Sequence, residues 1–328
     1  MTGDCRASCR MLFAVILLLI GASGKAQEVP VAAGQTIRVD VARVNVGVVV
    51  TDEKGKFVEG LHRAAFHVFD NGAEQRITEF APVEEPGQVL LLVEAGPAAY
   101  FLQSANLFAA DAMLKGLSPG DRVAVARYTD APLGIQDFTT DKVAAQGALS
   151  SIQFNLGFAD LNLSSSLGGV LDWLEHVPGK KTIVLISTGV DTSPSSASAA
   201  LQTRLRVGDV RILCVSTSGP LRNGKQGGKA KIQQTQDEFA AADRRLQAIA
   251  ELTGGRAYFP MSGKAFQETY KQVAEIVRHE YSLAFALPVA DGAVHSIDVK
   301  VDRVGAAGKF MAAAFRVDHR KGYQAPKE

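Results

Sequence analysis

The feature that most constrains the fold is a set of short apolar segments in the middle of the chain. VLLLVE (residues 89–94) and TIVLIST (182–188) are apolar at nearly every position and do not alternate with polar residues. A strand with this pattern is buried on both faces, as in a parallel sheet that helices cover on either side. RILCVST (211–217) is the next such strand along the chain. A chain with these strands must also supply the helices that cover them.

Helical periodicity fills the intervals between these strands. Pro97 suits a first helical turn, where its missing N–H has no cost. Further short strands are predicted at 121–129 and 256–259. Alternating strands and helices define the α/β class, with a doubly wound, mostly parallel sheet. Apolar residues at helical spacing predict helices over 97–117, 141–151, 163–176, 195–207, 236–253 and 263–278.

Both ends of the chain have a different pattern, typical of antiparallel strands. FHVFDNGAEQRITEF (66–80) reads as two strands around Asn71-Gly72, which is a strong hairpin signal. The tail contains three further strand candidates at 280–287, 295–303 and 309–317. We predict that the two β segments pair into one small antiparallel β-sandwich and that the α/β domain is inserted between them.

These patterns divide the chain into four parts. The predicted parts are a signal peptide (1–26), the first half of the β-sandwich (36–81), the α/β domain (88–278) and the second half of the sandwich (280–322). The segment between 81 and 88 contains two prolines and a glycine, which is typical of a linker.

The N-terminus has the pattern of a secretion signal. Arg6 and Arg10 precede an apolar run at 11–20, which is too short to span a bilayer. Gly24 and Ala26 supply the small residues that precede a cleavage site. We therefore expect an exported protein, periplasmic or secreted, with no membrane span after cleavage. The alternative is an uncleaved N-terminal anchor.

Net charge limits the classes of partner that the chain indicates, and cysteine content limits its disulfide bonds. The formal net charge is +1, so the chain as a whole does not indicate nucleic acid or an anionic membrane as a partner. Cys5 and Cys9 lie in the predicted signal, and only Cys214 remains beyond it. An intramolecular disulfide is therefore not expected, and Cys214 suits a buried core position.

One glycine-rich segment carries a cluster of basic residues. SGPLRNGKQGGKAKIQQ (218–234) is predicted to form a loop. It is a candidate contact for an anion or a partner, and the alternative is a flexible solvated loop. The residues concerned are Arg222, Lys225, Lys229 and Lys231.

Several motifs, in order, resemble the von Willebrand factor A-type domain family, and more narrowly the secreted bacterial VWFA-related proteins. VNVGVVVTDEKGKFVEGLHRAAFHVFDNGAEQRITEF (44–80) is similar to the N-terminal β module of that group. KKTIVLISTGVDTSP (180–194) and ELTGGRAYFP (251–260) are similar to A-domain strands. EYSLAFALP, HSIDVKVDR and FRVDHRKGYQAP are similar to the closing β module, so the resemblance covers residues 37–326.

The resemblance implies a divalent-cation site at the carboxyl edge of the sheet, from which this chain departs. Family members use Asp-x-Ser-x-Ser in the first loop, a threonine in the second and an aspartate in the third, and such oxygens suit a hard cation. Here Glu94, Gly96 and Ala98 occupy the first loop, Leu161 the second and Thr188 the third. The family's metal-binding residues therefore do not carry over, and no cofactor is expected.

A binding rim is still predicted at this edge. In one interpretation Glu94 is hydrogen-bonded at the strand end and Asp191 caps a loop or helix start. In the other, Glu94, Asp160 and Asp191 converge on a non-standard Mg²⁺ or Ca²⁺ site. The candidate rim residues are Glu94, Gly96, Asp160, Asn162, Ser164, Thr188 and Asp191.

Catalytic motifs are missing from the sequence. The six histidines are scattered, with no H-x-x-x-H spacing, and there is no G-x-S-x-G elbow. We therefore expect a non-catalytic, exported module of the adhesion type that binds a protein of unknown identity without the usual cation. The alternatives are a metal-dependent A-type adhesion domain and, further off, an envelope enzyme or small-molecule receptor.

Overall fold

The computed structural model describes residues 42–83, 86–97, 103–155, 157, 160–223, 229–304, 310–312 and 315–327. By contacts, this part of the chain belongs to one compact unit, Val41–Glu328. The predicted signal peptide lies outside the described residues, as do Ala98 and Lys225. The proposed domain boundaries remain predictions.

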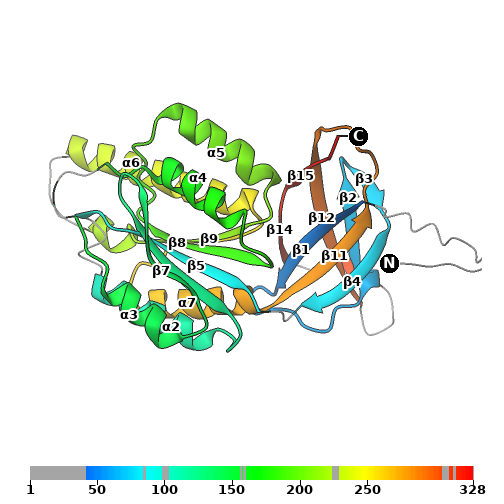
Figure 1. The fold of residues 1–328 in the computed structure, drawn as a ribbon, viewed down its shortest axis with the longest axis horizontal. Coiled ribbons are helices and arrows are strands. Elements are labelled where there is room, and N and C mark those ends of the chain that lie inside the picture. The colour runs from blue at the N-terminus through cyan, green and yellow to red at the C-terminus, as the bar shows by residue number, and fades with distance from the viewer. Residues whose placement is uncertain are drawn as a thin grey trace, which may run out of the picture. The chain divides into compact units, whose positions relative to one another are not determined.

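The centre of the α/β part is a six-stranded sheet with the order β10-β9-β8-β5-β6-β7 (Figure 1). Five strands are parallel to their neighbours, and β7 pairs antiparallel with β6 at one edge. The predicted mostly parallel sheet is therefore confirmed. The strands are β5 (Gln88–Glu94), β6 (Arg122–Tyr128), β7 (Pro132–Thr139), β8 (Lys181–Ser187), β9 (Arg211–Ser216) and β10 (Ala257–Tyr258).

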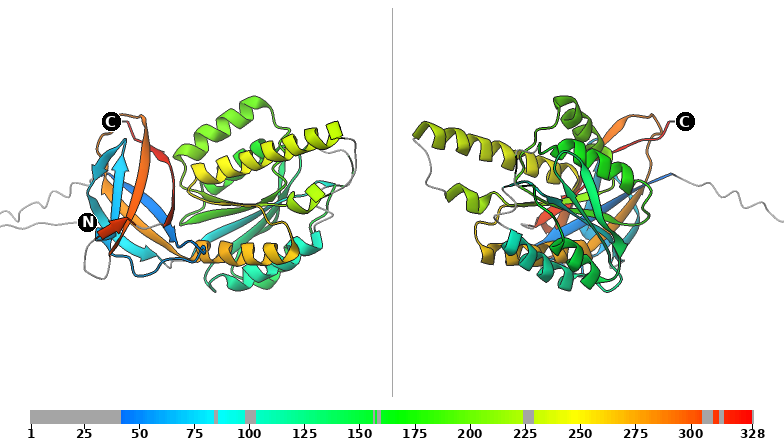
Figure 2. Two further views of the ribbon diagram at one scale, coloured as in Figure 1. Left: turned by 180° about the vertical axis from the view of Figure 1, so that it is seen from behind. Right: turned by 60° about the vertical axis from the view of Figure 1, so that its left-hand side comes forward.

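Helices cover both faces of this sheet (Figures 1 and 2). Leu91 of β5 packs into the core on the side of α2 (Gln103–Gly116), α3 (Lys142–Ser150) and α7 (Gly263–Arg278). Its neighbours Leu90 and Leu92 pack into the other core, on the side of α4 (Leu163–Leu174), α5 (Ser195–Val207) and α6 (Lys229–Leu252). Burial on both faces explains why this strand is continuously apolar.

Strands from both ends of the chain form two antiparallel sheets. One has the order β14-β1-β11-β4, and the other has the order β13-β12-β2-β3 with β15 paired to β12. Phe66 of β2 contacts Phe80 and Tyr281 of the first sheet, with ring centroids 5.3 and 5.1 Å apart. The predicted fold class, a doubly wound sheet inserted in a β-sandwich, is confirmed. These strands are β1 (Arg43–Thr51), β2 (Phe66–Asp70), β3 (Ala73–Gln75), β4 (Ile77–Val83), β11 (Glu280–Ala286), β12 (Val294–Val304), β13 (Phe310–Ala312), β14 (Arg316–His319) and β15 (Gly322–Gln324).

The structure corrects three local predictions. The sequence analysis missed β7, because an exposed edge strand that begins with Pro132 lacks the apolar pattern of a buried strand. The strand predicted at 309–317 is two strands, since β13 pairs with β12 in one sheet and β14 pairs with β1 in the other. As part of the same correction, the tail ends in one more strand, β15.

The third correction concerns the predicted basic loop at 218–234. Residues Gly219–Asn223 form a short 3₁₀ helix, and α6 already begins at Lys229. Lys, Ala and Gln are good helix formers, and they follow directly after the last glycine of the segment. Among the helices of the described residues, none is both long and apolar enough to cross a membrane.

Candidate functional site

Glu94 is the centre of a buried polar cluster at the carboxyl edge of the sheet. Its Oε2 accepts hydrogen bonds from the Thr188 N–H (2.8 Å), the Thr188 hydroxyl (2.8 Å) and the Ser187 hydroxyl (2.9 Å). The Tyr128 hydroxyl lies 3.3 Å from the same oxygen and 2.8 Å from Ser187 Oγ. All four residues are buried. One oxygen of the carboxyl group therefore has four protein donors around it.

Strand register brings these side chains together. Glu94 ends β5 and is directly paired with Tyr128 at the end of β6. Ser187 ends β8, the other neighbour of β5, one residue beyond the pair Val93–Ile186. The carboxyl ends of parallel strands meet at one edge, where α/β folds place their ligand sites.

Burial controls the ionisation of the cluster. Burial raises the pKa of Glu94, and the hydrogen bonds from Thr188, Ser187 and Tyr128 oppose this shift. Burial and the neighbouring Glu94 raise the pKa of Tyr128 well above its usual range. Tyr128 therefore remains a neutral hydrogen-bond donor at physiological pH.

Leu161 packs closely against Gly96 of the first loop. A Cβ atom added to Gly96 would lie 2.8 Å from Leu161 Cδ2 and 3.7 Å from Glu94 Oε1. The leucine methyl thus occupies the space above the first loop, and only glycine at position 96 leaves room for it. The Leu161 N–H donates to Thr192 Oγ1 (2.9 Å), and its carbonyl accepts from the Thr192 N–H (2.9 Å), so the second loop is fixed to the third.

Asp191 belongs to a different cluster, at the start of α4. Its carboxylate accepts from the Ser164 hydroxyl and N–H and from the Ser193 N–H (3.0 Å). Burial raises its pKa, but the hydrogen bonds from Ser164 and Ser193 outweigh burial and lower it. Arg245 Nε lies 3.9 Å from the same carboxylate. This geometry agrees with the prediction that Asp191 caps a helix start, since Ser164 lies in the first turn of α4.

The remaining predicted rim residues lie outside both clusters. Asp160 is exposed. The Asn162 side chain donates to the Asp130 carbonyl (3.2 Å) and accepts from the Thr192 hydroxyl (3.0 Å). Among the described residues, no group of three or more His, Cys, Asp or Glu side chains is placed to hold a metal ion. Glu94, Asp160 and Asp191 therefore do not converge as the metal-site alternative requires.

Arg222 is the one member of the predicted basic group whose side chain is described. The Arg222 guanidinium donates to Ser218 Oγ (2.9 Å) and to the Asp243 carboxylate, and it lies 5.3 Å from the centroid of the Phe239 ring. Arg222 thus has internal partners, and the role of the basic group stays a prediction. The backbone of Lys229 and Lys231 is in α6, which places them on a helix and not in a loop.

The sequence analysis missed three members of the site. Tyr128, Ser187 and Thr192 were not among the candidate residues, although each supports Glu94 or the loops around it. A signal was present, because Tyr128 and Ser187 are polar residues at the ends of otherwise apolar strands.

The strand order, the helices on both faces and the loops at the carboxyl edge of β5, β6 and β8 define a doubly wound α/β domain. No family model and no curated protein matches the sequence.

Several solved structures are similar to this chain. One is a von Willebrand factor type A protein from Catenulispora acidiphila, with 11% identity, a TM-score of 0.47, and coverage of 78% of this chain and 73% of that one. An aerotolerance-related membrane protein from Bacteroides fragilis has 11% identity, a TM-score of 0.43, and coverage of 58% and 98%. BatB from Bacteroides thetaiotaomicron has 14% identity, a TM-score of 0.39, and coverage of 58% and 98%. The first of these is, by its name, of the family that the sequence resembles.

Proposed function

We propose that the protein is a non-catalytic, exported interaction module of the A type, which binds a protein partner through the rim without the divalent cation. The rim consists of residues 95–97, 160–164 and 188–193. The proposal rests on fold and site together, because an A-type fold alone does not determine a function.

The observation that supports the proposal is that protein donors fill the hydrogen-bonding capacity of the Glu94 carboxyl group. Four protein donors surround its carboxyl group, and a methyl group of Leu161 fills the space beside Gly96 in the first loop. A cation bound by Glu94 would have to replace these hydrogen bonds. A partner would therefore contact protein groups directly, among them the exposed Asp160 and Val190 of the rim.

The burial of the same cluster supports a non-catalytic role. Ser187, Thr188 and Tyr128 have hydroxyls beside a carboxyl group, which superficially resembles a nucleophile with a base. Ser187 and Tyr128 are completely buried and Thr188 is 3% exposed. A reacting group must come within about 3.5 Å of its nucleophile, and these hydroxyls offer no approach to a substrate.

Cation titration tests metal independence. We expect the melting temperature to stay constant when Mg²⁺, Mn²⁺ or Ca²⁺ is raised to millimolar concentration, because an ion that binds only the folded state must raise it. A saturable increase that Glu94→Gln abolishes would overturn the proposal in favour of a metal-dependent adhesion domain. Asp209→Asn, an exposed carboxylate outside the rim, is the matched control.

Partner capture tests the rim itself. Envelope proteins captured by the wild type in EDTA should be lost with Val190→Arg and retained with Val294→Arg, since both valines are exposed and only Val190 is in the rim. Equal capture by the two variants would contradict the assignment of the rim. Cell fractionation of the full chain tests the expected export.

A further inference from the structure

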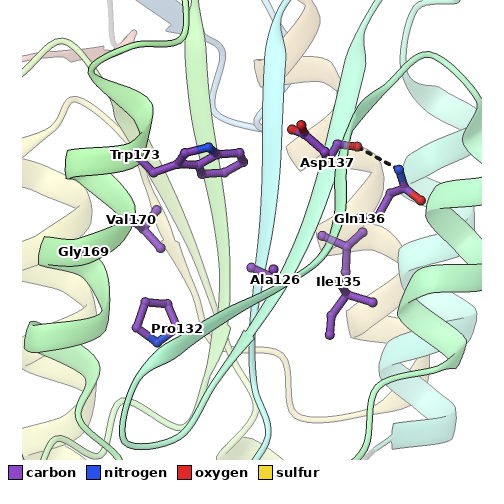
Figure 3. A pocket seen from close by; sticks show the side chains of 10 residues that line it. Ala126, Pro132, Ile135, Gln136, Asp137, Gly169, Val170 and Trp173 are labelled. Carbon is purple, nitrogen blue, oxygen red and sulfur yellow. Dashed lines mark hydrogen bonds between the residues drawn. The ribbon is translucent and has the colours of Figure 1, made fainter.

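A pocket of about 430 Å³ lies away from the rim, on the face of the sheet that α4 only partly covers (Figure 3). Its walls come from β6, from the edge strand β7 and from α4. Pro132 and Val170 give it apolar sides, and Trp173 and Asp137 lie on opposite walls. A volume of this size, with apolar walls and few polar groups, is typical of small-molecule sites.

Trp173 gives the pocket an aromatic wall. Its side chain is 41% exposed, which is unusual for so large an apolar group. The indole stacks on Phe138 with a centroid distance of 5.2 Å and an interplanar angle of 19°, which fixes the orientation of the ring. A fixed, accessible indole provides a negatively polarised face for a cation.

Asp137 is the only charged residue among those that line the pocket. Its Oδ1 accepts the Phe138 N–H (2.6 Å), which orients the carboxylate. No ion pair with Asp137 is found within the described residues. The guanidinium of Arg122 donates to the Phe138 carbonyl, 3.1 Å away, and lies 5.8 Å from the Phe138 ring centroid. The pocket thus has one acidic group without a basic partner.

We propose that this pocket binds an organic cation. The ammonium or guanidinium head lies between the Trp173 indole and the Asp137 carboxylate, and the apolar part of the ligand lies against Pro132 and Val170. An aromatic face and a carboxylate on opposing walls attract positive charge, and the apolar walls exclude strongly hydrated inorganic ions. This site is separate from the rim and does not depend on the proposed function.

The chain itself provides the reporter for a test, because Trp173 is its only tryptophan. Choline and its neutral isostere 3,3-dimethylbutan-1-ol are titrated while the tryptophan fluorescence is followed. We expect a saturable change with choline and at least about fivefold weaker binding of the alcohol, as the loss of one cation–π contact implies. Equal responses to the two compounds would overturn the proposal without any substitution.

Two variants locate the charge that is recognised. Asp137→Asn should weaken choline binding by about fivefold, whereas Asp172→Asn should leave it unchanged. Asp172 is an exposed carboxylate next to Trp173 in the sequence, but it does not line the pocket. If Asp137→Asn binds choline as the wild type does, the carboxylate has no role and the proposal fails. Calorimetry with Trp173→Leu provides a readout independent of fluorescence, and there choline binding should be lost.

Two guanidinium compounds identify the source of the cation. Agmatine represents a free small molecule, and acetyl-Ala-Arg-Ala-amide represents an arginine side chain in a polypeptide. Tighter binding of agmatine supports a small-molecule ligand, and tighter binding of the peptide supports a side chain that enters beside the edge strand β7. If neither binds and choline also fails, the proposal is wrong, whereas the cation titration at the rim is unaffected.

Discussion

At Glu94 the protein supports a buried carboxyl group with hydrogen-bond donors from neighbouring strand ends. Three of the four donors, the Ser187 hydroxyl and the hydroxyl and N–H of Thr188, come from the end of β8. The fourth donor is the Tyr128 hydroxyl. A buried acceptor with several donors has all the hydrogen bonds it needs. Each of those donors, however, has this one acceptor as its partner and loses its hydrogen bond if the acceptor is removed. The cluster should therefore be sensitive to a change that removes acceptor capacity.

Glu94→Gln is the sharpest test of this arrangement. The carboxamide replaces one acceptor oxygen by an NH₂ group. The NH₂ group then faces hydrogen-bond donors, and a hydroxyl can accept a hydrogen bond from it only after the O–H bond has rotated away. We expect the free energy of unfolding to fall by about 1–3 kcal/mol, the penalty for leaving buried polar groups unsatisfied. Urea unfolding measures it, with Asp160→Asn as the exposed control, which should change stability by less than about 0.5 kcal/mol. A Gln variant as stable as the control would show that the hydrogen bonds contribute little.

His295 is a second buried polar centre, in the β-sandwich. Its Nδ1 lies 3.0 Å from both Asp70 oxygens and 3.2 Å from the Tyr323 hydroxyl, and its Nε2 lies 3.2 Å from Asp291 Oδ1. The hydrogen bond to Asp70 raises the pKa of His295, burial opposes this, and Asp291 adds to it. The imidazole thus links β12 to the end of β2, and it lies beside Tyr323 of β15.

The raised pKa predicts how stability depends on pH. A group whose pKa is higher in the folded state than in the unfolded state stabilises the folded protein when it is protonated. This contribution is complete at a pH below the unfolded-state pKa, near 6.5, and it is lost as the pH rises through the folded-state pKa. The difference in unfolding free energy between the wild type and His295→Gln should therefore be largest in acid and fall towards alkaline pH. His67 and His319 are present in both proteins and cancel in the comparison. A difference that is constant across pH would contradict the link to Asp70 and Asp291.

Among the elements, the loop after β8 depends on one glycine. Gly189 has a φ of +81°, and an added Cβ would lie 2.7 Å from the Ala242 carbonyl oxygen and 2.9 Å from Leu246 Cγ of α6. The Gly189 N–H also donates to Ser187 Oγ (2.9 Å). The close approach of α6 and the conformation of this loop therefore both require glycine.

Gly189→Ala should destabilise the protein by about 2 kcal/mol or more, because it combines an unfavourable φ with a clash against backbone. Gly168→Ala is the matched control. Gly168 lies inside α4 with open space around its Cα, so alanine there should be neutral or stabilise by about 0.5–1 kcal/mol. Thermal unfolding of both variants measures the contrast. A mild effect at Gly189 would mean that the loop can move away from α6.

The elements differ in how well the sequence predicts them. The apolar stripe of α7 places Phe266, Tyr270 and Val273 in the core, and the predicted bounds 263–278 agree with the structure. β7 was missed, since an edge strand has little apolar burial to leave a pattern. Glu94 could be placed at the rim because the apolar run of the strand ends at this residue in the sequence. The contact between Leu161 and Gly96 could not be predicted, because it depends on how two distant loops pack.

In the molecule as a whole, Arg211 connects the central sheet to the first sheet of the sandwich. Its Nε donates to the Gly254 carbonyl (3.0 Å), its Nη1 to Glu280 Oε2 (2.8 Å) and its Nη2 to the Gly47 carbonyl (3.2 Å). Burial opposes ionisation of Glu280, but Arg211 and Lys180 hold its pKa below the usual value. An ion pair of this kind is costly to break from one side, because the remaining charge stays buried without its partner.

Arg211→Met should therefore lower the free energy of unfolding by about 3–5 kcal/mol. The control is Arg43→Met, which removes an arginine from an exposed pair with Glu79 and should change stability by less than about 1 kcal/mol. Adding Glu280→Leu to Arg211→Met removes the carboxylate, which then has only Lys180 at 3.7 Å as a basic partner, and should restore part of the loss, which a double-mutant cycle in urea measures. If the loss is as small as in the control, the pair does not couple the two sheets. If the loss is large and the second substitution restores nothing, the hydrogen bonds to Gly47 and Gly254 carry the coupling instead of the charge pair.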